Sequence, residues 1–87
     1  MGKNKEALTT FTKIIRLDPK YALAWRKKGA ALGKMMRYDE ALEAFDRSIE
    51  LDPNDATSWN DKALALKILG RKKEAKEAKN VEKRLMK

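Results

Sequence analysis

The stretch LDPKYALAW, residues 17–25, returns 34 residues later as LDPNDATSW, residues 51–59. Leu, Asp, Pro, Ala and Trp keep their order and spacing in both copies. The same offset aligns residues outside this stretch, including Phe11 with Phe45. A fixed period of this length indicates an array of structural repeats that stack on one another.

Each repeat contains two segments with helical periodicity. Small and apolar side chains recur in these segments at steps of three and four residues, so they lie on one face of a helix. In the middle of the chain they are Ala22, Trp25, Gly29, Leu32, Met36, Tyr38, Ala41, Leu42, Phe45, Ser48 and Ile49. Pro19 and Pro53 end the preceding helices, because proline lacks the amide N–H and its ring clashes with the previous turn. Gly70 is placed to end another helix in the left-handed conformation.

These signals predict an all-α fold with five helices. The expected helices cover residues 4–17, 22–35, 38–51, 56–69 and 72–85. Glycine inside a helix costs about 0.5–1 kcal/mol relative to alanine. We therefore expect Gly29 to serve packing, by letting a neighbouring helix approach closely. The other small residues expected at helix contacts are Ala7, Ala41, Ala63 and Ala75, with Phe11, Trp25, Phe45 and Trp59 filling the gaps.

The repeat resembles the tetratricopeptide repeat, a helix–turn–helix unit of 34 residues. The resemblance rests on Trp25, Gly29, Leu32, Tyr38, Ala41, Phe45 and Pro53 in residues 22–55, on Trp59, Leu66 and Ala75 in residues 56–87, and on Ala7, Leu8, Phe11 and Pro19 in residues 3–21. The departures from the family pattern are Lys28, Ser48, Lys62, Ala63 and Lys79. Leu32 is also a partial departure, because Tyr is commoner than Leu at that position of the family pattern. The resemblance implies that helical hairpins form a right-handed superhelix, an α-solenoid, whose concave side binds peptide segments of other proteins.

On this basis residues 1–87 form a single array in three parts. They are a half repeat over 3–21 that supplies only a second helix, a full repeat over 22–55, and a final repeat over 56–87. In the last helix, Lys76, Lys79 and Lys83 take the places of Leu42, Phe45 and Ile49. Because a terminal repeat needs a polar outer face, we expect this helix to cap the array. The alternative is a solvated basic tail.

The first expected helix keeps an apolar face formed by Phe11, Ile14 and Leu17. The helix that would precede it in a full repeat is missing, and monomers seldom leave such a face open. Two explanations stay open: the chain is a piece of a longer array, or a second copy covers the face. The second explanation predicts a homo-oligomer that associates through these three residues.

The chain lacks cysteine and histidine. This composition excludes disulfides, thiolate or imidazole metal sites, and catalysis by either side chain. The carboxylates of Asp39, Glu40 and Glu43 lie at a helix start, where they complement the helix dipole. We therefore expect no enzyme activity, no cofactor and no metal. No apolar run reaches the roughly 18 residues that cross a bilayer, so we expect a cytoplasmic protein without a membrane partner.

The family geometry places the first helix of each repeat on the concave side. The expected groove residues are Leu23, Arg26, Lys27, Ala30, Lys34, Thr57, Asn60, Asp61, Leu64 and Lys67. Their basic side chains favour an acidic peptide or a C-terminal carboxylate, and Asn60 can hydrogen-bond the peptide backbone. Members of the family that clamp acidic chaperone tails use paired Lys and Asn residues in this groove. Ala30 and Asp61 stand where the Asn residues are expected, so that clamp is not reproduced here.

The sequence thus predicts an interaction module or scaffold that binds other proteins or peptides. Its net charge of +8 is uneven, at +8 in residues 1–37, −5 in 38–70 and +5 in 71–87. The basic segments leave nucleic acid as an alternative partner. However, lysine is interleaved with glutamate in the last helix, and both tryptophans are expected to pack rather than stack on bases. The opposed charges also suit a self-associating scaffold, and any single groove residue can simply be part of a solvated helix face.

Overall fold

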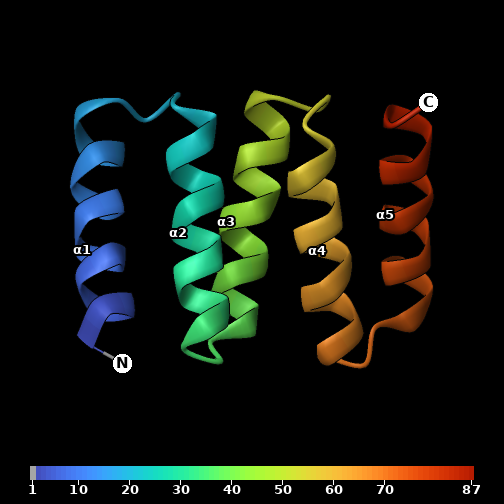
Figure 1. Ribbon diagram of the computed structural model, residues 1–87, viewed down its shortest axis with the longest axis horizontal. Helices are drawn as coiled ribbons and strands as arrows, with labels where there is room; N and C mark the ends of the chain where they lie inside the picture. The colour runs from blue at the N-terminus through green and yellow to red at the C-terminus, as the bar shows by residue number, and fades with distance from the viewer. Residues whose placement is uncertain (1) are drawn as a thin grey trace.

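The computed structural model describes residues 2–87 as five α-helices joined by short turns (Figure 1). The helices are α1 (Gly2–Leu17), α2 (Ala22–Lys34), α3 (Tyr38–Leu51), α4 (Ala56–Ile68) and α5 (Lys72–Leu85). They alternate in direction and form a row with α1 at one end and α5 at the other (Figure 1). The predicted all-α fold is confirmed, and each predicted helix end lies within two residues of the observed one. Met1, the first residue of the predicted array, lies outside the described residues.

The joint between repeats explains why the opening stretch occurs twice. The indole Nε1 of Trp25 donates a hydrogen bond to the carbonyl oxygen of Pro19 at 2.9 Å, and Trp59 makes the same bond to Pro53 at 2.8 Å. Each tryptophan therefore fastens the start of its helix to the turn that precedes it. The two prolines are exposed, so they contribute to the turn and do not belong to the core.

Two lysines that depart from the family pattern lie against these tryptophans. The Nζ atoms of Lys28 and Lys62 lie 5.4 Å from the ring centroids of Trp25 and Trp59. At this distance the aromatic ring attracts the ammonium group. Lys62 also pairs with Asp46 at 2.8 Å, which links α4 to α3. At these two positions, where the chain departs from the family pattern, a lysine therefore places its charge near the face of the indole.

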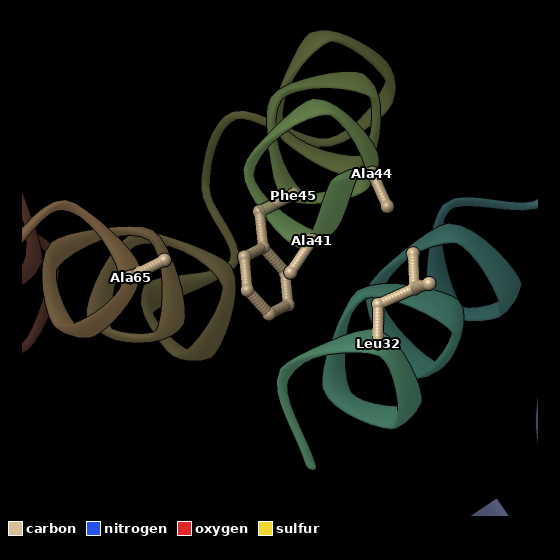
Figure 2. Close-up of a cluster of buried hydrophobic side chains, with 5 residues drawn as sticks. All are labelled: Leu32, Ala41, Ala44, Phe45 and Ala65. Carbon is tan, nitrogen blue, oxygen red and sulfur yellow. The ribbon is translucent and has the colours of Figure 1, made fainter. Parts of the chain in front are cut away.

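The core lies where α2, α3 and α4 meet (Figure 2). Its buried side chains are Leu32, Ala41, Ala44, Phe45 and Ala65, with Leu8 and Trp25 packed against them. The ring of Phe45 points from α3 into the space between α2 and α4 (Figure 2). A Cβ atom on Gly29 would lie only 2.5 Å from Cε1 of this ring. The packing reason expected for Gly29 is therefore the close approach of Phe45.

A second core cluster joins α3, α4 and α5. It contains Leu42, Ala63, Leu66, Ala75 and Ala78, with Trp59 and Leu69 packed against it. Most of its members are alanines, so α5 adds much less apolar volume to the fold than α3 does. Helix α5 therefore contributes only small side chains to this cluster, and the cluster's large side chains come from α3, α4 and the turn after α4.

The prediction that Met36 lies on the apolar face of the second helix is wrong. Helix α2 ends at Lys34, and Met36 is 75% exposed with a φ of 61°. The amide of Arg37 donates to the carbonyl of Leu32 at 2.9 Å, and the amide of Met36 donates to Gly33 at 3.0 Å, a helix-ending pattern that needs a left-handed residue. Gly70, 34 residues later, takes the same conformation with a φ of 80°, as predicted.

Helix α1 packs on α2 through one of its sides. Ile15 is buried, and Phe11 and Ile14 are half-buried. Leu17 is 89% exposed, so the helix end that carries it projects apolar surface into solvent. Among residues 2–87, no helix combines the length and the apolar character needed to cross a membrane.

Candidate interaction surface

Helices α2 and α4 carry the ten residues predicted for the groove, of which six are exposed and four are half-buried. We call the surface that they form the concave face, after the side on which the family resemblance places them. Between the two helices lies a hollow of about 360 Å³. It is lined by Ala30, Gly33, Lys34, Tyr38, Ala41, Phe45, Asp61, Leu64, Ala65 and Ile68. Leu64 and Ile68 are 53% and 57% exposed, which is unusual for large apolar side chains next to a core. The structure thus brings four predicted residues, Ala30, Lys34, Asp61 and Leu64, around one hollow, and adds Ile68, which was not predicted.

Arg26 is already engaged within the protein. Its Nε lies 3.3 Å from Oδ2 of Asp55, and the two side chains link α2 to the start of α4. The same Asp55 accepts a hydrogen bond from the amide of Thr57 at 3.0 Å and so caps α4. Arg26 therefore supports the stacking of the repeats and is less available to a ligand than the sequence suggested.

The ion pair continues into a buried hydrogen-bond network. The hydroxyl of Ser58 lies 3.1 Å from Asp55 Oδ2 and 3.1 Å from the hydroxyl of Ser48, which donates to the carbonyl of Ala22 at 2.9 Å. Both serines are fully buried. Sequence reasoning missed this network, although Ser48 is one of the departures from the family pattern. A polar residue on a buried helix face is the signal that could have revealed it.

Asn60 is also partly engaged. Its Oδ1 accepts a hydrogen bond from Nζ of Lys79 at 3.0 Å, and Lys79 pairs with Glu82 at 2.7 Å. The first contact ties α4 to α5, and the second lies within α5. The Nδ2 group of Asn60 makes no hydrogen bond within residues 2–87, so it remains a donor for a peptide carbonyl.

Asp61 is half-buried at the hollow and makes no hydrogen bond or ion pair with the residues that the structure describes. Its pKa is raised, chiefly by burial, which disfavours the charged form. Arg26 and Lys27 oppose this rise through their positive charge, while Asp55 and Glu82 add to it. A carboxylate in this setting gains from a ligand that offers an N–H group or a cation.

The remaining predicted residues leave positive charge and apolar surface on the concave face. Lys27, Lys34 and Lys67 are exposed and form no ion pair within residues 2–87. Leu23 is exposed beside them, and so is Thr57. The described residues hold no cluster of three or more acidic side chains that could bind a metal ion. The face therefore offers lysines, apolar side chains and one partly desolvated carboxylate.

Family models of the tetratricopeptide repeat match residues 22–55 and residues 44–77. The chain belongs to the tetratricopeptide repeat family. Sequence comparison finds no significant relative among curated proteins. The family identity therefore rests on the repeat pattern itself and on the fold.

Solved structures with the same fold include two repeat domains in complex with chaperone peptides. One is the TPR2B domain of yeast Sti1 in a complex with pHsp70, with a TM-score of 0.94, 26% identity, and coverage of 97% of this chain and 67% of that chain. Another is the second TPR of Spaghetti (RPAP3) bound to the HSP90 peptide SRMEEVD, with a TM-score of 0.94, 27% identity, and coverage of 97% and 78%.

A third similar structure is MamA, with a TM-score of 0.93, 24% identity, and coverage of 97% of this chain but only 49% of that chain. At this identity the likeness shows the fold alone. The family match and the two peptide-bound neighbours support a protein–protein interaction module for this tetratricopeptide repeat array.

Proposed function

We propose that the chain is a non-enzymatic module that binds an acidic peptide segment of a partner protein along the concave face. The observation that carries the proposal is the hollow of about 360 Å³ between α2 and α4. Large apolar side chains stay exposed at this hollow, beside Lys34, which forms no ion pair within residues 2–87. Exposed apolar surface rimmed by polar groups is typical of binding sites.

The charges define how such a peptide lies on the face. Carboxylates of the peptide approach Lys27, Lys34 and Lys67, which form charge-assisted hydrogen bonds with them. Asp61 repels carboxylates at the centre and accepts backbone N–H groups instead. The Nδ2 group of Asn60 donates to a peptide carbonyl. The peptide in the similar Spaghetti structure, SRMEEVD, has acidic residues of the kind that these lysines favour.

Calorimetric titration with short synthetic peptides tests the proposal. The probe is a peptide with several glutamates and a free C-terminal carboxylate, and the comparison peptide has lysine in place of each glutamate. We expect the double variant Lys27→Glu/Lys34→Glu to bind the acidic peptide about tenfold or more weakly, because two attractive charges become repulsive. The matched variant Lys13→Glu/Lys20→Glu has the same change in charge at exposed positions outside the face and should bind within about twofold of the parent.

Two outcomes would contradict the proposal. In one, both double variants lose affinity equally, which indicates attraction by net charge alone. In the other, mixed-sequence RNA binds with a steep salt dependence while neither peptide binds. That result would favour nucleic acid as the partner.

Self-association is a second candidate function, favoured by the exposure of Leu17 at the end of α1 and by the incomplete burial of Phe11 and Ile14. If a second copy covers this surface, sedimentation velocity should show a larger species as the protein concentration rises. Leu17→Glu should abolish that species. A monomer at every concentration would exclude this candidate.

A further inference from the structure

A second groove lies between α4 and α5. These two helices are the last in the row (Figure 1). We call this second groove the end groove. It has a volume of about 410 Å³ and is lined by Asn60, Ala63, Leu64, Lys67, Lys72, Ala75, Lys76 and Lys79. Its floor is apolar, since Ala63, Leu64 and Ala75 provide it, while its rim carries four lysines. None of the helices in residues 2–87 covers it.

The preceding hairpin shows what fills a groove in this position. The 34-residue offset places Ala63, Leu64 and Ala75 on Gly29, Ala30 and Ala41 of the hairpin α2/α3. Helix α4 packs beside that hairpin, chiefly on α3, and buries Ala65 against the cluster that contains Phe45 (Figure 2).

Helix α4 buries Ala65 against the hairpin α2/α3, and the side chains next to Ala65 border the hollow and stay partly exposed. Asp61, Leu64 and Ile68 line the same hollow as Ala65, at steps of three and four residues. A groove of this shape therefore accepts a helix that has an apolar stripe with this spacing.

The rim of the end groove defines the charge of its occupant. Lys72, Lys76 and Lys79 replace Tyr38, Leu42 and Phe45 of the preceding hairpin. Lys79 is held by Asn60 and Glu82, but the other three lysines of the rim form no ion pair within residues 2–87. Lysine covers apolar surface with its stem and keeps its ammonium group in solvent, so the rim presents ammonium groups to whatever lies on the floor.

We propose that the end groove binds an amphipathic helix of a partner protein, with carboxylates flanking its apolar stripe. The helices of this chain do not meet that description. Helix α1 carries four basic residues and one acidic residue, so a second copy would bring like charge to the rim. Helix α3 is acidic, but Ala41, Phe45 and Ile49 on its apolar side are already buried. This inference does not rest on the peptide proposed for the concave face, although the two surfaces share Asn60, Leu64 and Lys67.

The experiment uses an end-blocked synthetic peptide of about 16 residues, long enough to form a helix on binding. It carries Leu, Ala and Ile at the spacing of residues 64, 65 and 68, with glutamate on both flanks of this stripe. A matched peptide has lysine in place of every glutamate. Titrated calorimetrically into the whole 87-residue chain, the glutamate peptide should bind at a single site, and the lysine peptide should bind at least about tenfold more weakly.

Charge variants on α5 locate the site. Lys72→Glu/Lys76→Glu should weaken the glutamate peptide by about tenfold or more, and Lys72→Gln/Lys76→Gln should give an intermediate loss. The matched variant Lys73→Glu/Arg84→Glu changes the same charge at exposed positions of α5 outside the groove, and its affinity should stay within about twofold. Thermal unfolding of each variant checks that the fold is retained.

A variant of the concave face separates this inference from the proposed function. Lys27→Glu/Lys34→Glu should weaken the extended acidic peptide but leave the helical peptide within about twofold, because neither residue lines the end groove. The inference is overturned if the helical peptide does not bind, if both α5 double variants lose affinity equally, or if the concave-face variant abolishes helix binding. It is also overturned if the chain forms a dimer that Lys72→Glu/Lys76→Glu dissociates, because a second copy would then occupy the groove.

Discussion

The hairpins α2/α3 and α4/α5 have the same arrangement of helices and align at the 34-residue offset. However, α4 packs on the groove of the first hairpin, whereas no described helix packs on the groove of the second. In the first, Gly29 makes room for Phe45, and α4 packs beside the pair. In the second, the equivalent positions hold Ala63 and Lys79, and no described helix packs beside them. The shared repeat residues therefore determine how each hairpin folds. The side chains exchanged at positions 29/63 and 45/79 determine whether the groove of the hairpin is filled by the core or stays available to a partner.

The largest expected effect comes from removing the ring that closes the first hairpin. Phe45 is 4% exposed, and Phe45→Ala should lower the free energy of unfolding by about 3–5 kcal/mol. Lys79→Ala, at the equivalent position, should cost less than about 1 kcal/mol, because an exposed ion pair contributes little. Chemical denaturation followed by far-UV circular dichroism measures both. If both variants lowered the free energy of unfolding equally, the two hairpins would not differ at this position and the comparison would be contradicted.

A smaller loss is expected when the space for the ring is filled. Gly29→Ala improves helix propensity, but its Cβ would lie 2.5 Å from the Phe45 ring, so we expect a net loss of about 1–3 kcal/mol. The reverse change, Ala63→Gly, should cost only about 0.5–1 kcal/mol, because no ring needs that space.

A double-mutant cycle with Phe45→Leu sharpens the comparison at Gly29. A smaller side chain at position 45 relieves the overlap, so Gly29→Ala should cost less in that background. An unchanged cost would contradict the account of this contact.

The turns after α2 and α4 differ at the residue in the left-handed conformation, and this difference predicts a gain in stability. Met36 adopts the left-handed conformation that Gly70 adopts in the equivalent turn. Met36→Gly should raise the free energy of unfolding by about 1 kcal/mol, because glycine avoids the clash between Cβ and the carbonyl oxygen. Gly70→Ala should lower it by a similar amount, since its Cβ would meet no atom within 4 Å and only backbone strain is added. If Met36→Gly destabilises the protein, the side chain has a packing role that its exposure does not suggest.

The smallest effect concerns Asp61, which takes the place of Lys27 in the second hairpin. Burial raises the pKa of Asp61, so the folded chain holds its proton more tightly than the unfolded chain does. Its contribution to the free energy of unfolding therefore falls as the pH rises from the unfolded value of about 3.9 through the folded pKa.

Asp61→Asn should accordingly stabilise the protein at neutral pH, by less than about 0.5 kcal/mol. The gain should vanish in acid, where the aspartate is neutral in both states. Thermal unfolding across pH measures the difference, and a gain that grows in acid would have the wrong sign.

The sequence predicted the features that repeat with the period of 34. Two of these features depend on residues close by. Pro19 and Pro53 end a helix through their effect on their own turn, and the missing side chain of Gly29 affects only the nearest helix. Met36 could also have been placed correctly, since the offset aligns it with Gly70.

The pairs between repeats could not be predicted in the same way. Arg26 with Asp55 and Asn60 with Lys79 depend on how one helix rotates against the next, which residue spacing does not determine. This rotation decides which residues of the concave face stay available. Lys27 and Lys34 remain free within residues 2–87, whereas Arg26 does not.

Mapping a bound acidic peptide by nuclear magnetic resonance tests the central claim most directly. Amide signals of the isotope-labelled chain are followed while the peptide with a free C-terminal carboxylate is added at physiological salt. The account predicts saturable shifts concentrated on α2 and α4 around Lys27, Lys34 and Leu64, with α1 unchanged. Shifts spread over the basic surfaces of α1 and α5, or shifts that disappear at physiological salt, would contradict it.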